Sequence, residues 1–98
     1  MFVKIWRYKF KKEYFLRWKR NNDAVLKIYK RSGGTYKRLI KKELGFFDVI
    51  ELGFYNSKKH FLKVIKQLDS DSQIDILFKD FLNIIHKRKY SEEEFNTI

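Results

Sequence analysis

Aromatic side chains with polar tips are the residues of this chain best suited to chemistry. Two tryptophans, six tyrosines and ten phenylalanines occur among 98 residues. Indole and phenol groups combine apolar walls with hydrogen-bonding tips, a combination typical of pockets for small hydrophobic or aromatic molecules. With one histidine added, the candidate pocket residues are Trp6, Tyr8, Trp18, Tyr55 and His60. The competing interpretation is that these side chains form an ordinary hydrophobic core.

The remaining polar residues match no known catalytic or metal-binding pattern. His60 and His86 are the two histidines, and neither has the spacing of a metal-ligand motif. We interpret His60 as a structural or pocket residue and His86 as a cation at a helix end. The acidic stretch 69–75 lacks the glycine and closing glutamate of a calcium loop, and the chain has no cysteine. We therefore predict no metal site and no cofactor.

The positive charge lies entirely in the first half of the chain. The net charge is +11; residues 1–49 hold 15 basic and 4 acidic side chains, whereas residues 50–98 hold 8 of each. Such an excess favours a nucleic-acid partner. The candidate phosphate-binding residues are Arg7, Lys9, Lys37, Arg38 and Lys41. The alternative is compositional, because lysines on solvated surfaces and sheet edges also promote solubility.

Hydrophobic periodicity predicts the elements that position these residues in the first half. Residues 2–10 alternate as a strand with apolar groups on both faces, so we expect both faces to be covered. Residues 12–31 follow a helical period, interrupted at Asn21-Asn22-Asp23, where Asp23 is expected to cap a second segment. Gly33-Gly34 ends this helix, and residues 35–43 form a lysine-rich edge strand.

The second half continues with a strand over residues 46–54. Asn56 or Ser57 is expected to cap a helix that ends before the loop 69–72. A third helix follows and runs to about Lys87, and residues 89–98 form either a final edge strand or a loose tail. The predicted order is β-α-β-β-α-α-β over one domain, residues 1–98. This is a ferredoxin-like α+β fold, in which an antiparallel sheet carries its helices on one face.

With this order of strands and helices, the chain resembles the antibiotic biosynthesis monooxygenase-like family of dimeric α/β barrels. The first strand, Val3-Lys4-Ile5-Trp6-Arg7-Tyr8-Lys9-Phe10, is similar to the opening strand of the family. The helix end Ile28-Tyr29-Lys30-Arg31-Ser32-Gly33-Gly34 and the segment Tyr55-Asn56-Ser57-Lys58-Lys59-His60-Phe61 follow two further family patterns. The haem-degrading branch is not indicated, because Trp6 stands where that branch has an asparagine.

The resemblance implies a homodimer with its two sheets packed face to face and a pocket between sheet and helices in each subunit. It also implies that the chain binds a small hydrophobic or aromatic molecule. Some members of the family oxidise such a molecule without metal or flavin, so monooxygenase-like activity is an open question. A non-catalytic dimeric interaction protein, with its pocket filled by its own aromatic residues, is another alternative.

An RNA-recognition module is the strongest competitor with this topology. Its third strand carries a glycine- and aromatic-rich motif, and Leu44-Gly45-Phe46-Phe47-Asp48-Val49 keeps part of that pattern. Asp48 replaces an aromatic residue that would stack on a base, which removes a contact worth about 1–3 kcal/mol.

The apolar runs are too short to span a membrane, and the first residues lack the apolar core of a signal peptide. We expect a cytoplasmic protein with no membrane partner.

Overall fold

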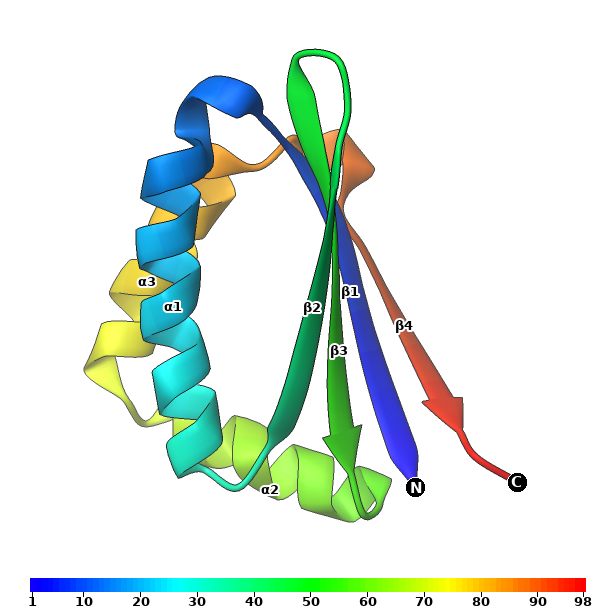
Figure 1. Ribbon diagram of the computed structural model, residues 1–98. Coiled ribbons are helices and arrows are strands. Elements are labelled where there is room, and N and C mark those ends of the chain that lie inside the picture. The colour runs from blue at the N-terminus through cyan, green and yellow to red at the C-terminus, as the bar shows by residue number, and fades with distance from the viewer.

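The order of elements along the chain confirms the predicted α+β arrangement. A computed structural model describes residues 1–98. Its elements are β1 (Phe2–Lys11), the short 3₁₀ helix η1 (Lys12–Tyr14), α1 (Phe15–Arg31), β2 (Thr35–Lys42), β3 (Phe46–Tyr55), α2 (Lys58–Asp69), α3 (Ser72–Ile84), the 3₁₀ helix η2 (Lys87–Lys89) and β4 (Ser91–Asn96). The helices α1 and α3 lie along one side of the sheet, and α2 crosses near the end that holds the N-terminus (Figure 1).

The four strands form one antiparallel sheet in the order β2-β3-β1-β4, which is the ferredoxin-like topology. The two central strands, β1 and β3, pair over their full length, with Trp6 opposite Glu51 and Tyr8 opposite Val49. The predicted edge position of β2 is confirmed. For the C-terminal residues the sequence allowed either an edge strand or a loose tail. They form the edge strand β4, which pairs with β1.

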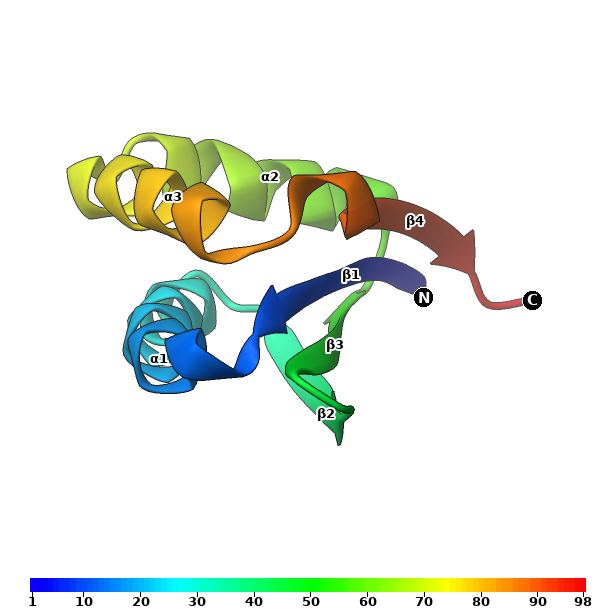
Figure 2. The same ribbon diagram turned by 90° about the horizontal axis from the view of Figure 1, so that it is seen from above.

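The two faces of the sheet differ in what covers them. In β1 the residues from Phe2 to Phe10 that face the helices are mostly buried, as alternation requires. No helix covers the opposite face, as the view from above shows (Figure 2). That open face carries an apolar group contributed by all four strands: Val3, Ile5, Leu39, Ile50, Leu52, Phe54 and Phe95. The expected second cover of β1 is therefore absent from the single chain.

The covered side of the sheet holds two separate hydrophobic clusters. One lies at the α2 end and contains Phe2, Ile28, Tyr55, Phe61, Val64 and Leu68. The other lies at the opposite end and contains Tyr8, Phe10, Trp18, Val49, Ile84 and Ile85. Lys4 and Trp6 of β1 lie between the two clusters along the strand, so the middle of the covered face is not filled by either of them.

The predicted interruption of the first helix at residues 21–23 is wrong. α1 is continuous from Phe15 to Arg31. Asparagine disfavours helix interiors because its side chain competes for backbone hydrogen bonds. Here the side chain of Asn22 instead donates to Glu51 of β3, at 3.0 Å, and accepts from Arg38 of β2. Asp23 pairs with Lys19 and Arg38 and does not cap a second segment.

The predicted end of the third helix is also wrong. α3 ends at Ile84, and Ile85 forms an isolated bridge with Phe10 of β1. The backbone N–H of His86 then donates to the carbonyl of Lys9 at 2.8 Å, so His86 follows the helix and is not its terminal cation. Pairing with β1 therefore ends the helix earlier than its apolar period suggests. The cap of α2 is Ser57, whose hydroxyl accepts from the N–H of His60.

None of the helices combines the length and apolar character needed to cross a membrane.

The contacts of Asn22 lead to a prediction about stability. Asn22→Ala should lower the free energy of unfolding by about 2 kcal/mol, because it leaves partners of a buried hydrogen-bond network unsatisfied. This loss should exceed the gain of about 0.5 kcal/mol that alanine brings to a helix interior. Urea denaturation measures the difference. The exposed Arg20→Ala on the same helix is the control, and equal effects of the two substitutions would contradict the structural role of Asn22.

Candidate functional site

A cavity of about 110 Å³ lies between the sheet and the helices α1 and α3. Its lining consists of Trp6, Asn21, Asn22, Val25, Leu26, Tyr29, Tyr36, Glu51, Ile74, Phe78, Phe81 and Tyr90. It occupies the middle of the covered face, where Trp6 lies between the two hydrophobic clusters. A groove of about 430 Å³ adjoins it toward α2 and shares Trp6, Tyr29, Ile74, Phe78 and Tyr90.

Aromatic rings from three elements form one wall of the cavity. Trp6 of β1 stacks on Tyr36 of β2, with ring centroids 5.9 Å apart. Tyr29 of α1 meets both rings edge-on, at 4.7 Å from Tyr36 and 6.2 Å from Trp6. Because the three rings brace one another, this wall is held in shape without a ligand. The hydroxyl of Tyr36 also hydrogen-bonds that of Tyr55, which ties the wall to the cluster near α2.

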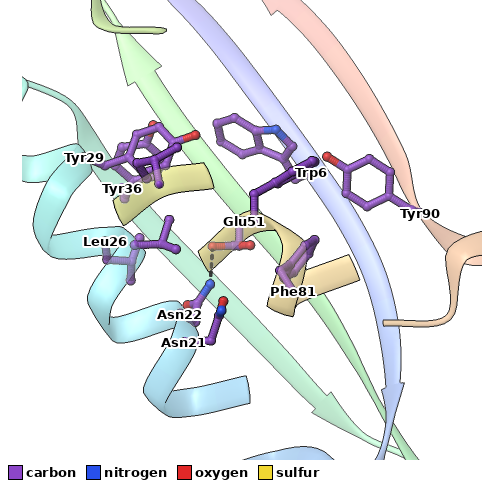
Figure 3. Close-up of a pocket in the computed structure, with 12 residues that line it drawn as sticks. Trp6, Asn21, Asn22, Leu26, Tyr29, Tyr36, Glu51, Phe81 and Tyr90 are labelled. Atoms are coloured by element: carbon purple, nitrogen blue, oxygen red, sulfur yellow. Dashed lines mark hydrogen bonds between the residues drawn. The ribbon is translucent and has the colours of Figure 1, made fainter. Parts of the chain in front are cut away.

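The other end of the cavity is polar. Figure 3 shows the carboxylate of Glu51 beside the amides of Asn21 and Asn22, away from the rings of Tyr29 and Tyr36. Asn22 donates to Glu51 Oε1 at 3.0 Å and accepts from Arg38 at 2.5 Å. The guanidinium of Arg38 also pairs with Asp23 at 2.8 Å, so Asn22 lies between Arg38 and Glu51 and contacts both.

Burial raises the pKa of Glu51 above its usual range. Hydrogen bonds from Asn22 and Tyr8 and the charge of Arg38 act in the opposite direction without cancelling the effect. A carboxylate held in such surroundings accepts a proton more readily than one in water. Groups of this kind collect at functional sites, since their interactions with a ligand are not weakened by solvent.

Asn21 holds a second acceptor, which is buried beside the cavity. Its side chain is 4% exposed, and its amide nitrogen donates to the carbonyl of Leu77 at 2.8 Å. Its side-chain oxygen has no hydrogen-bond partner. Buried polar atoms are almost always paired, so an unpaired oxygen at a cavity wall marks a place where a donor is expected.

The rim of the groove carries ionised side chains. Lys4 on β1 is 8% exposed and bridges Glu92 and Glu94 of β4, at 3.2 and 3.5 Å. The hydroxyl of Tyr90 donates to Glu92. These contacts hold the edge strand against β1 and keep the single basic group of the groove occupied.

The five predicted pocket residues do not lie together. Trp6 lines the cavity. Tyr8 and Trp18 are buried in the second cluster, where the Trp18 indole donates to the Tyr8 hydroxyl at 2.8 Å. Tyr55 belongs to the first cluster, and His60 packs edge-on against it, 5.7 Å away, outside the cavity. Of the five, Tyr8, Trp18 and Tyr55 thus lie within the two hydrophobic clusters, and His60 lies outside the cavity.

The polar residues of the cavity were missed by the sequence reasoning. Glu51 is the one carboxylate on the covered face of the central strand β3 and lies opposite Trp6. That position was a usable signal, because an unpaired charge on a covered face is costly and rarely accidental. The sequence predicts Asn21 and Asn22 only as a helix interruption, and nothing in their local sequence indicates partners on other elements.

The five candidate phosphate-binding residues also divide between two faces. Arg7, Lys9, Lys37 and Lys41 belong to the open face of the sheet, whereas Arg38 points toward α1. Arg7 pairs with Asp48 at 2.9 Å, and Lys9 lies 3.9 Å from Glu43. The ion pairs of these residues reduce the charge available to a nucleic acid on that face.

Comparisons with known proteins find similarity in structure and not in sequence. No protein-family model matches the chain, and no curated protein matches it. An uncharacterised NIPSNAP domain protein from Burkholderia xenovorans superposes with a TM-score of 0.80 at 12% identity, over 100% of this chain and 95% of that one. An antibiotic biosynthesis monooxygenase superposes with a TM-score of 0.76 at 8% identity, over 100% and 99%.

A third solved structure is a variant of SnoaB, a cofactor-independent oxygenase from Streptomyces nogalater. It superposes with a TM-score of 0.69 at 7% identity, over 98% of this chain and 92% of that one. Identities this low establish the fold alone. The chain therefore has the ferredoxin-like fold of antibiotic biosynthesis monooxygenase-like and NIPSNAP proteins along its whole length, which confirms the resemblance suggested by its sequence.

Proposed function

We propose that this protein binds a small, mostly apolar molecule in the cavity between the sheet and α1 and α3. The observation that carries this proposal is the pairing of a braced aromatic wall with the half-buried carboxylate of Glu51. Small-molecule sites combine apolar lining with a few fixed polar groups that set the orientation of the ligand. The cavity meets both conditions within one space, and the adjoining groove extends it toward α2.

The energetic cost of Glu51 supports the same proposal. Even a half-buried carboxylate is costly to desolvate, and an apolar side chain opposite Trp6 would pack against the covered face without that cost. α1 places two asparagines against this position in spite of their poor helix propensity. A costly charge that needs compensating groups from other elements, against local helix propensity, is typical of a site kept for binding.

Oxidation of the bound molecule is a second candidate function, and the basicity of Glu51 is the observation that favours it. Loss of a proton makes an electron-rich ligand able to give electrons to dioxygen, so an oxidation without a cofactor needs a base beside the ligand. Two of the structural neighbours bear the names of a monooxygenase and a cofactor-independent oxygenase.

An oxygen electrode tests this second function with each compound that binds in the cavity. Oxygen consumption should disappear in Glu51→Gln. The absence of oxygen consumption with every bound compound would reject the oxidation.

We further propose that two copies of this chain form a homodimer through the open face of the sheet. Leu39 is 57% and Phe95 50% exposed in the single chain, and the five other apolar residues of that face are only partly covered. A contiguous apolar surface contributed by all strands is typical of an interface, and sheets pack well face to face. The resemblance to dimeric barrels supports the same arrangement.

Binding in the cavity can be tested with neutral aromatic probes such as indole and naphthol. Trp6→Ala should weaken the binding of these probes at least about tenfold, because the variant removes the largest side chain of the aromatic wall. Isothermal calorimetry measures the affinity, and a thermal melt establishes that the variant is folded. Leu62→Ala changes an exposed residue of α2 outside the cavity and should leave the affinity unchanged. Equal affinities for wild type and Trp6→Ala would contradict the proposed site.

The homodimer can be tested by light scattering at low micromolar concentration. The wild-type protein should have a mass near twice 12.1 kDa, and Leu39→Glu should reduce it toward 12.1 kDa because charges would face each other across the interface. Leu16→Glu on α1 is the matched control, since Leu16 is 71% exposed and lies away from the open face. A wild-type monomer, or a dimer that survives the Leu39 change and dissociates with the Leu16 change, would refute this interface.

A further inference from the structure

The cavity and its groove are acidic, although the protein as a whole is strongly basic. Their combined lining contains four carboxylates, Glu51, Asp69, Asp75 and Glu92, against one basic side chain, Lys4. The net charge of the complete chain is +11. The composition of the chain therefore does not explain the sign of the charge at the site.

The one basic group of the lining is not free to bind an anion. Lys4 is already held between Glu92 and Glu94 of β4. Asp75 pairs with Lys79 on the exposed side of α3, whereas Asp69 makes no ion pair. An anionic ligand would thus meet Glu51 inside the cavity and acidic side chains at the rim, and both would repel it.

The inner end of the cavity offers acceptors and few donors. Glu51 supplies a carboxylate, and the side-chain oxygen of Asn21 is buried without a partner although its amide nitrogen is used. The amide nitrogen of Asn22 is occupied by Glu51. A ligand group that carries several hydrogen-bond donors would satisfy the unpaired oxygen and the carboxylate together.

The aromatic wall favours the same kind of ligand. The faces of Trp6 and the tyrosine rings carry partial negative charge and attract a cation held near them. Figure 3 shows the rings of Tyr29, Tyr36 and Trp6 on one side of the cavity, with Tyr90 beside Trp6, whereas the carboxylate of Glu51 turns toward Asn22 on the other side. An ammonium group would find in one cavity a carboxylate, an unpaired carbonyl oxygen and aromatic faces.

We infer that the ligand of this cavity is a small organic cation: an amine with an aromatic or branched aliphatic body, whose ammonium group donates to Glu51 and to the side-chain oxygen of Asn21. The body lies against Trp6 and extends into the apolar part of the groove, beside Phe61 and Ile65. This inference rests on the proposed binding function and adds the charge and the donor group of the ligand.

Three probes of similar size and different charge test the inference. Phenethylamine is a cation at neutral pH, phenethyl alcohol is neutral and phenylacetate is an anion. Calorimetry should show at least about tenfold tighter binding of the amine than of the alcohol, as expected of a charge-assisted hydrogen bond in a buried site, and the weakest binding for the acid. In a ¹H–¹⁵N correlation NMR spectrum, addition of the amine should shift the indole N–H signal of Trp6. The indole signal of Trp18, which lies outside the cavity, should not shift.

Glu51→Gln removes the charge and keeps the shape and the acceptor oxygen. It should abolish the preference for the amine over the alcohol, whereas Glu93→Gln removes the same charge from the opposite face of the sheet and should preserve it. Because burial raises the pKa of Glu51, its ionised form opposes folding at neutral pH, so Glu51→Gln should be at least as stable as the wild type. If Glu51→Gln does not fold, the difference in affinity between amine and alcohol for the wild-type protein still tests whether the ligand is a cation.

The outcomes separate this inference from the binding function on which it rests. Equal binding of amine and alcohol, tighter binding of the acid, or binding of indole without binding of phenethylamine would overturn the cationic ligand and leave the pocket in place. Failure of every probe, including indole and naphthol, to bind or to shift Trp6 would overturn both.

Discussion

The middle of this protein is organised around a carboxylate that faces the covered side of a sheet. Glu51 lies on central strand β3 opposite Trp6, where an apolar side chain would ordinarily join the two hydrophobic clusters into one. A charge on the covered face of a sheet is tolerated only if other groups compensate for its lost hydration. Asn22, Tyr8 and Arg38 do so here from α1, β1 and β2. The charge thereby links three elements and leaves space between the clusters.

This requirement explains features that otherwise conflict with local propensity. An Asn-Asn pair in the middle of α1 is unfavourable for an isolated helix, yet each amide has a partner on a different element. Arg38 belongs to a lysine-rich edge strand but turns inward, because Asn22 and Asp23 meet it there. Local disagreement between sequence and structure is therefore concentrated around one group, which is the pattern expected near a functional site.

Most of the fold could be predicted from the sequence because it depends on periodicity. The alternation in β1 and β3, the glycine turn after α1 and the cap Ser57 are local signals, and each is present in the structure. The errors occur where a distant partner overrides the local signal, at Asn22 through Glu51 and at Ile85 through Phe10. For the same reason Trp6 could be found as an aromatic candidate, whereas the role of Asn21 depends on α3 and could not. Glu51 could also have been identified as a candidate from the sequence, since its charge interrupts a mostly apolar strand.

The relation between fold and site limits what the structural neighbours can say about function. Proteins that superpose over nearly the whole chain at 7–12% identity share the arrangement of backbone layers and hence the place where a cavity can form. The side chains that line this place are a property of each sequence. In a chain with a net charge of +11, a cavity and groove that present four carboxylates and one occupied lysine require a local explanation. The proposed cationic ligand would supply one, because a carboxylate inside a cavity discriminates between cations and anions more strongly than an exposed charge on the surface.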